Sequence, residues 1–550
     1  MKTGFTLGGE QAEADPLLEE AFYETGYYSV LESRRDARCF LVGRTGAGKS
    51  AALQHLEASN PERVIRITPE NLSLPYITDL QVFRYLDSLN VNLDLIWIAL
   101  WKHVLLVEII RKRYNVNSQA AKQRFLAQLR EKLSRDRGKQ QALEYFDEFE
   151  GRFWCEADER VREITEKFTR DIEAEAKLGG RAGIVTGSLG ATISDHREAA
   201  SRSELADRFQ RIVNSTQLAR LNTMQDVLDE FILDDQHYTY VVIDDLDRDW
   251  VDERLANDLI RCLFRSVLDM GNIEHLKLLV ALRTNIFEEL DFGKRSGGQE
   301  EKFRALVLDV RWTEGDLTEL LDERVRAAAV HDGLPFAKMS ELLPAANKAR
   351  GNPMEYIIQR TLLRPRDAIA FANECLALGA GKARLAWTDI FSAERTYSHK
   401  RLLALRDEWK LTYPGIEDVY DMLRGAPSRM TRSALQARLE DMMLLVGESE
   451  FAGVRWLTDL SSQMWSPSGG SAWFDLYQPL LRLLYRLGLI GCSLHGSARP
   501  IFFTDDELLL DSRANVEKMD YFFVHRMYRE ALEIATEPPR EPPRGQGRRR

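Results

Sequence analysis

Gly43-Arg-Thr-Gly-Ala-Gly-Lys-Ser50 matches the pattern G-x-x-x-x-G-K-[ST] at every fixed position. In such a loop the glycines let backbone N–H groups wrap a phosphate chain, and the helix that follows presents its positive end to the same phosphates. The alternative is a glycine-rich turn without a ligand. It is disfavoured because a strand-like run, Arg38–Val42, precedes the motif and a helical run, Lys49–Ala58, follows it.

We therefore expect this loop to bind ATP together with Mg²⁺. Lys49 is expected to reach the β- and γ-phosphates, and the Ser50 hydroxyl is expected to bind the metal ion. The predicted nucleotide-binding residues of the loop are Gly43, Arg44, Thr45, Gly46, Ala47, Gly48, Lys49 and Ser50.

A second motif, Tyr238-Thr-Tyr-Val-Val-Ile-Asp-Asp-Leu-Asp247, consists of an apolar run that ends in acidic residues. A buried strand of this kind delivers carboxylates to the edge of a sheet. Asp244 is expected to hold Mg²⁺ through its water shell, and Asp245 is expected to orient or deprotonate the attacking water. Two adjacent acids favour hydrolysis over phosphoryl transfer to a small substrate. The structural alternative is a pair of capping carboxylates at a strand end.

Another apolar run, Leu276–Leu282, leads directly into Arg283, Thr284 and Asn285. Polar groups at the tip of a strand beside Asp244 can sense the γ-phosphate or position water, so Arg283 and Asn285 are predicted catalytic residues and Thr284 is a further candidate. Arg283 can act on its own site or face a neighbouring subunit. The alternative is an ordinary surface arginine.

Arg364 and Arg366 flank a proline at the start of a helical run, after the predicted sheet has ended. A helical lid at this place can lay either arginine over the phosphates, and both are predicted nucleotide ligands. The alternative is a salt bridge at the helix start, to Asp367 or Glu374.

The order of these patterns predicts an α/β fold, with a parallel sheet of the P-loop NTPase kind, a long helical insertion, a helical lid and a C-terminal winged-helix-like domain. Further strands are expected at Arg63–Ile67 and Arg304–Arg311, and a small hairpin is expected at Arg181–Ser194. The predicted segments are the first part of the ATPase core at 1–75, the insertion at 76–235, the rest of the core at 236–314, the lid at 315–400, the winged-helix-like domain at 401–537 and a disordered basic tail at 538–550.

Composition excludes several classes of protein. The net charge of −11 gives no chain-wide nucleic-acid footprint, and five scattered cysteines without a CxxC pair argue against a disulfide framework or a zinc site. The most apolar stretch, Leu93–Ile110, contains Asp94, Lys102, His103 and Glu108, so we expect a buried helix rather than a membrane span. The N-terminus has no apolar signal-peptide core. These features predict a cytoplasmic protein without a membrane partner.

The motifs GRTGAGKS, VVIDDLDR, LLVALRTNIF, WTEGDLTELLDERV and TLLRPRDAIAFAN together resemble bacterial P-loop ATPases close to the STAND and KAP groups, within the AAA+-like ASCE division. The ending LYRLGLIG…FFVHRMYREALEI is similar to the winged-helix tails of such proteins. The resemblance implies an ATP-driven switch that forms homo-oligomers, acts with a protein effector and belongs to bacterial anti-phage defence. The long helical insertion departs from a minimal core of this kind.

Three functions stay open from the sequence. The first is a switch ATPase whose nucleotide state controls self-assembly or a partner effector. The second is a nucleic-acid-dependent ATPase, a loader or remodeller that contacts DNA or RNA through the C-terminal region, where Pro538–Arg550 carries five arginines against one glutamate. The third is a slow or inactive nucleotide-binding scaffold.

Overall fold

The computed structural model describes two compact units of the chain. The sheet unit contains Glu24–Arg44 and Lys49–Val310, and the helical unit contains Met1–Tyr23, Thr45–Gly48 and Arg311–Arg550. Within these limits the described residues are 1–68, 93–114, 123–124, 127–128, 131, 170, 219–233, 236, 238–246, 253–290, 300–448, 451, 454–465, 473–494 and 499–535. The hairpin predicted at Arg181–Ser194 and the basic tail at Pro538–Arg550 lie outside them.

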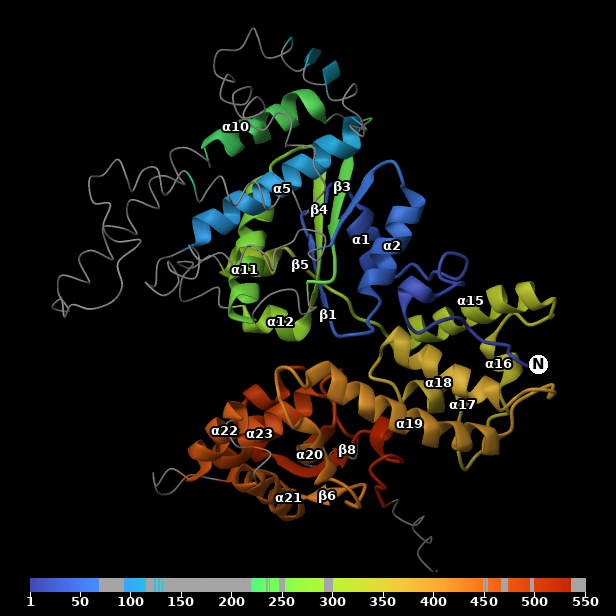
Figure 1. The fold of residues 1–550 in the computed structure, drawn as a ribbon. Coiled ribbons are helices and arrows are strands. Elements are labelled where there is room, and N and C mark those ends of the chain that lie inside the picture. Colours follow the sequence, from blue (N-terminus) through green and yellow to red (C-terminus); the bar gives the residue numbers. More distant parts are fainter. Residues whose placement is uncertain are drawn as a thin grey trace, which may run out of the picture. The chain divides into compact units, whose positions relative to one another are not determined.

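A five-stranded sheet forms the centre of the sheet unit (Figure 1). Its strands are parallel and follow the order β2 (Val64–Ile67), β3 (Thr239–Ile243), β4 (Leu276–Arg283), β1 (Phe40–Gly43) and β5 (Val307–Asp309). The predicted α/β fold with a parallel sheet is therefore confirmed. Strand β5 is shorter than the predicted Arg304–Arg311, because helix α14 (Glu300–Ala305) continues almost to its start.

The central strands β1, β3 and β4 are buried on both faces, which explains why their sequences are largely apolar, whereas the edge strand β5 is only partly buried. On one face, Val241 and Ile243 of β3 join a core formed with helices α5 (Asp94–Tyr114), α10 (Ala219–Val227) and α11 (Glu253–Met270) (Figure 1). On the other face lie α1 (Gly26–Glu32) and α2 (Lys49–Ser59). Two residues of this second face hold the end of α1: the Tyr240 hydroxyl donates to the Glu32 carbonyl, and Lys277 donates to the Val30 carbonyl.

Helix α5 is the apolar stretch whose charged residues argued against a membrane span. Most of its apolar residues are buried in the core of the sheet unit, and two of its charged residues, Asp94 and Lys102, have ion-pair partners there. Arg261 of α11 donates to both oxygens of Asp94 at 2.8 and 2.6 Å, and Lys102 lies 2.8 Å from Asp269. The predicted buried helix is confirmed, and none of the described helices is long and apolar enough to cross a membrane.

From Arg311 onward the helical unit first contains five helices: α15 (Glu314–Asp332), α16 (Met339–Leu342), α17 (Pro353–Ile358), α18 (Pro365–Ala377) and α19 (Trp387–Trp409). Thr313 and Asp316 form a capping box that begins α15, and Gly333 ends this helix in the left-handed conformation. Buried apolar side chains hold the helices together, and the rings of Phe371 and Tyr397 stack between α18 and α19 with centroids 4.5 Å apart.

The C-terminal part of this unit contains a three-stranded antiparallel sheet in the order β6, β8, β7. Its elements are α20 (Ile416–Asp421), β6 (Met430–Thr431), α21 (Arg432–Leu444), α22 (Arg455–Trp465), α23 (Trp473–Arg486), β7 (Ile490–Leu494), α24 (Arg513–Glu517) and β8 (Met519–Val524). Short 3₁₀ turns complete the unit at Ala12–Ala14, Leu445–Gly447, Leu509–Asp511 and Arg526–Tyr528. The sheet unit further contains α12 (Thr284–Glu289) and a π-turn at Leu228–Ile232.

Candidate nucleotide-binding site

The glycine-rich loop connects the end of β1 to the start of α2, as its sequence predicts. Gly46 and Gly48 have φ angles of 80° and 94°, a left-handed conformation that only glycine adopts readily. A Cβ atom at Gly46 would lie 2.9 Å from the Cβ atom of Arg366, so the close approach of a neighbouring side chain also requires glycine there. Lys49 Nζ donates to the carbonyls of Gly43 and Arg44, at 2.7 and 3.2 Å. The ammonium group is thus held over the loop in which it is expected to meet phosphates.

Asp244 follows β3 directly and is 5% exposed. Its Oδ2 accepts from Arg66 Nη1 at 3.4 Å, and Arg66 Nε donates to Glu57 at 2.8 Å. Arg66 is a residue that the sequence reasoning missed. The available signal was a basic side chain inside the otherwise apolar strand β2, next to β3.

Asp245 has a φ angle of 61°, one of the few left-handed non-glycine residues in the described chain. Aspartate tolerates this conformation better than most residues, but it still costs free energy. The turn lets the Asp245 N–H donate to Asp244 Oδ1 at 3.0 Å. This bond fixes one oxygen of Asp244 against the backbone of the turn.

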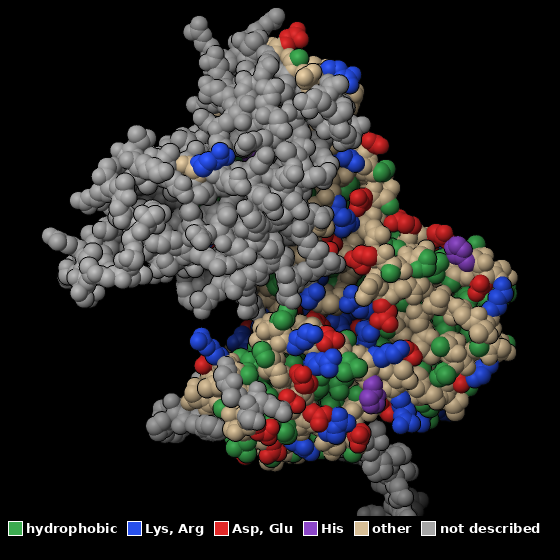
Figure 2. All heavy atoms as spheres, viewed as in Figure 1, with side chains coloured by type: hydrophobic (Ala, Val, Ile, Leu, Met, Phe, Trp, Pro, Cys, Tyr) green, Lys and Arg blue, Asp and Glu red, His purple; other side chains and the backbone are tan. Residues whose placement is uncertain are grey.

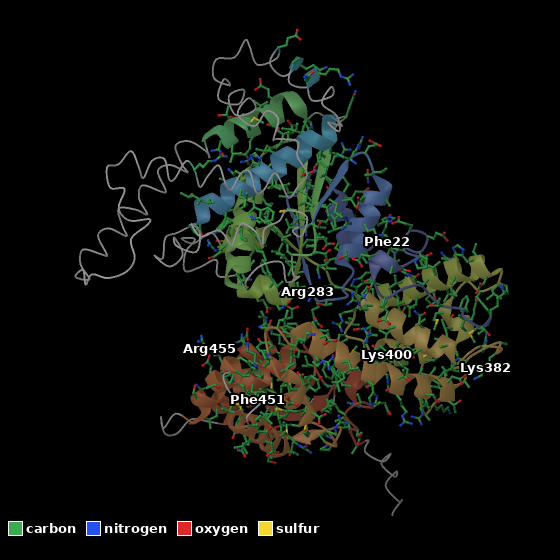
Figure 3. The ribbon with its side chains drawn as sticks, viewed as in Figure 1. Phe22, Arg283, Lys382, Lys400, Phe451 and Arg455 are labelled. Carbon is green, nitrogen blue, oxygen red and sulfur yellow. The ribbon has the colours of Figure 1, made fainter. Side chains whose placement is uncertain are left out.

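Strand β4 lies between β3 and β1 and ends at the same edge of the sheet. Its last residue, Arg283, is in register with Gly43, the first residue of the glycine-rich loop. Thr284 and Asn285 begin α12 immediately afterwards, and Figure 3 shows Arg283 at this end of the strand. The predicted residues Arg283 and Asn285 are thus at the edge where Asp244 and the loop also lie.

Three consecutive carbonyls at the tip of the loop accept hydrogen bonds from the helical unit, to which Thr45–Gly48 belongs. Arg364 Nη1 donates to Thr45 at 3.1 Å, the backbone N–H of Arg366 donates to Gly46 at 3.4 Å, and Trp312 Nε1 donates to Ala47 at 2.8 Å. Trp312 begins the quoted motif WTEGDLTELLDERV, but the sequence reasoning did not assign it to the site.

Arg364 and Arg366, predicted as phosphate ligands, have protein partners in this structure. Arg364 lies 2.7 Å from Asp367 and 3.1 Å from Glu408, so the helix-start salt bridge to Asp367 is present. The alternative partner, Glu374, pairs with Lys400. Arg366 Nε donates to the Glu10 carbonyl at 3.1 Å.

The ion pair of Arg364 and Asp367 is buried. Burial by itself raises the pKa of Asp367, but Arg364 and Arg401 outweigh that effect and hold the pKa of the carboxyl below its ordinary value. Arg401 Nη1 lies 3.4 Å from Asp367 Oδ1. Asp367 is therefore a charged residue that organises the start of α18.

The residues at this edge fit a magnesium nucleotide. The loop offers backbone N–H groups, an ammonium group and the Ser50 hydroxyl, and Asp244 offers a carboxylate oxygen. Thr45 Oγ1 is buried and has no hydrogen-bond partner among the described residues. A phosphate oxygen is a group that could satisfy such a hydroxyl.

Comparison with family models matches residues 315–406 to a FunZ-associated C-terminal helical domain. These residues run from α15 into α19, so the match supports a helical region after the parallel sheet. No curated protein matches the chain. The resemblance to P-loop ATPases stays a prediction, because the matched family concerns the helical region alone.

Proposed function

We propose that the chain is a Mg²⁺-dependent ATP hydrolase that acts as a nucleotide-controlled switch. One observation carries this proposal: the glycine-rich loop after β1 and Asp244 after β3 lie at the same sheet edge, with β4 between their strands. This is the edge at which parallel α/β sheets bind ligands. A P-loop fold of the ASCE type accounts for the sheet order β2-β3-β4-β1-β5 together with both motifs.

Each residue then has a distinct role. The N–H groups of the loop and Lys49 bind the phosphates, and Ser50 and Asp244 would hold Mg²⁺, which neutralises phosphate charge when bound. Asp245 orients the attacking water and accepts its proton. Arg283 and Asn285, at the end of β4, are positioned to contact the γ-phosphate.

The switch is supported by the contacts of the loop tip. The side chains of Trp312, just before α15, and Arg364, at the start of α18, both donate hydrogen bonds to carbonyls of the loop. A nucleotide that changes the loop conformation would therefore act directly on the starts of two helices. Such a local change is the means by which a ligand shifts a conformational equilibrium. Self-assembly, a protein effector and a role in anti-phage defence are the outputs that we propose for it.

The nucleic-acid-dependent alternative receives less support. The order β6-β8-β7, with α21 and α23 ahead of β7, agrees with the winged-helix interpretation. However, among the side chains of α23 that the structure describes, at 476–486, the exposed one is Arg482, which pairs with Asp511. Between Ile501 and Asp511 the chain carries four acids and no Lys or Arg. On the face shown in Figure 2, acidic and basic side chains are interspersed over the coloured surface. Phosphate backbones require a basic surface instead.

The first test is Lys49→Ala in the full chain, with Lys518→Ala as the matched control, because Lys518 is exposed. We expect the Lys49 variant to lose ATP binding or turnover and the control to keep both, as measured by phosphate release and by titration of a fluorescent ATP analogue. Near-normal turnover in Lys49→Ala would refute the assignment. ATP binding without turnover in the wild-type protein would indicate a scaffold, and stimulation by added DNA or RNA would favour the nucleic-acid-dependent alternative.

A further inference from the structure

A pocket of about 210 Å³ lies in the helical unit, away from the residues of the glycine-rich loop. It is bordered by the turn before α17, by α17 itself and by a residue that follows β8. Three arginines and one glutamate line it, and the lining residues that matter here are Arg350, Glu355, Gln359, Arg360 and Arg526.

Arg360 is the best-compensated cation of the pocket. Its Nε donates to Glu394 Oε1 at 2.5 Å, and its guanidinium lies 3.3 Å from the centroid of the Tyr356 ring. The Tyr356 hydroxyl occupies the other oxygen of Glu394, at 2.5 Å. Glu394 is 6% exposed, and each of its two oxygens accepts a hydrogen bond, one from Arg360 and one from Tyr356.

The other arginines have neutral partners. Arg526 donates to the side-chain oxygen of Gln359, and Arg350 lies 4.6 Å from the centroid of the Phe391 ring. Arg529, three residues after Arg526 in the sequence, donates from Nε to the Val524 carbonyl at 3.0 Å. Among the described residues, none of these three arginines has a carboxylate within ion-pair distance.

Four arginines therefore gather at this place against two acids, Glu394 and Glu355. Burial, followed by the positive charge of Arg360, lowers the pKa of Arg526. Burial, together with Arg526 and Arg360, lowers the pKa of Arg529 to about 10. Like charges that are half-buried together destabilise a fold unless an anion compensates them. The exposed Glu355 at the rim supplies at most part of this compensation.

We propose that this arginine pocket, formed by Arg350, Arg360 and Arg526, binds a small phosphate-bearing anion. Arginine forks match the oxygens of phosphate through paired hydrogen bonds. The volume fits phosphate or diphosphate better than a whole nucleotide, because pockets for drug-sized ligands measure roughly 300–1,000 Å³. The rings of Tyr356 and Phe391 are already covered by arginines, which leaves neither as a platform for a base.

The test uses the full-length chain with Lys49→Ala, so that the glycine-rich loop contributes as little as possible. Inorganic diphosphate, inorganic phosphate and AMP are titrated separately by calorimetry. We expect diphosphate or phosphate to bind, and AMP to bind no more tightly than phosphate, because arginines cover the Tyr356 and Phe391 rings and leave no platform for the base.

Arg350→Gln and Arg526→Gln, each added to the Lys49→Ala chain, should raise the dissociation constant at least about tenfold, since each removes a charge-assisted contact. Arg513→Gln is the matched control, because Arg513 is exposed and pairs with Glu517, outside the pocket. Arg350 is exposed, so its variant is expected to fold, and the thermal midpoint of every variant is measured. Absence of phosphate and diphosphate binding, or binding that Arg350→Gln leaves unchanged, would overturn the proposal. Because the pocket lies outside the loop, a failure here leaves the proposed ATPase function intact.

Discussion

We expect the main effect of Arg364→Ala to be a lower stability of the helical unit rather than a lower affinity for the nucleotide. The Arg364 guanidinium makes two bonds to Asp367, Nε to Oδ2 at 2.7 Å and Nη2 to Oδ1 at 3.2 Å, and a third to Glu408 at 3.1 Å. The Asp367 side chain is 0% exposed, so the substitution leaves a buried carboxylate with weaker compensation.

The expected loss follows from these contacts. Removing one partner of a buried ion pair costs about 3–5 kcal/mol. Arg401 stays near Asp367 Oδ1 at 3.4 Å, which places the expectation at about 3 kcal/mol, the lower end of that range. Domains of this size are stable by about 5–15 kcal/mol, so the variant should still fold.

The same ion pair leads to a prediction about the pH at which the protein unfolds in acid. Since the pKa of Asp367 in the folded chain lies below its ordinary value of 3.8, the ion pair contributes stability above that pH and loses it as the pH falls through the folded pKa. In Arg364→Ala the pKa of Asp367 rises, and acid unfolding should begin at a higher pH than in the wild-type protein.

Two methods measure the loss of stability and the earlier onset of acid unfolding in the full chain: urea denaturation monitored by tryptophan fluorescence, and calorimetry. Arg395→Ala is the matched control, because Arg395 is exposed on α19, and it should change stability by no more than about 0.5 kcal/mol. The reasoning fails if Arg364→Ala unfolds within about 1 kcal/mol of the wild-type protein. If ATP affinity in that variant also falls more than about tenfold, or 1.4 kcal/mol, Arg364 acts on the nucleotide site as well, either as a phosphate ligand or through its bond to the Thr45 carbonyl of the loop.

Three further outcomes are expected. Asp245→Asn should bind ATP but hydrolyse it about 10²–10⁴-fold more slowly. Asp244→Asn should instead weaken binding of the magnesium nucleotide. If kinetics and titration show the reverse pattern, the roles of the two residues are the reverse of those proposed. Trp312→Phe should destabilise the fold by about 1–3 kcal/mol in urea, because the buried Ala47 carbonyl loses its donor, and an unchanged stability would mean that this bond is unimportant. In Asp245→Asn, ATP should favour a larger oligomer by light scattering, and a single mass with and without ATP would contradict ATP-driven assembly.

Local patterns in the sequence were enough to predict most of the strands of the parallel sheet. Each of the five predicted runs overlaps a strand of the parallel sheet, because strands that are buried on both faces are largely apolar. The glycine-rich loop was equally readable, since Gly46 and Gly48 need left-handed φ angles that other residues resist. The charged residues of Leu93–Ile110 correctly indicated a buried helix, since they had to find partners such as Arg261 and Asp269 inside the fold.

Only the tertiary structure decided which distant residues meet. The pairing of Arg66 with Asp244, the register of Arg283 with Gly43 and the bond from Trp312 to Ala47 join positions far apart in the chain. The same holds for Arg364: the sequence left a phosphate and Asp367 as alternative partners, and packing of α18 against α19 buried the guanidinium with Asp367 and Glu408. Periodicity and residue type report what one segment of chain prefers. The partners of a charged side chain depend on which surfaces are packed together, and that information lies in no single segment.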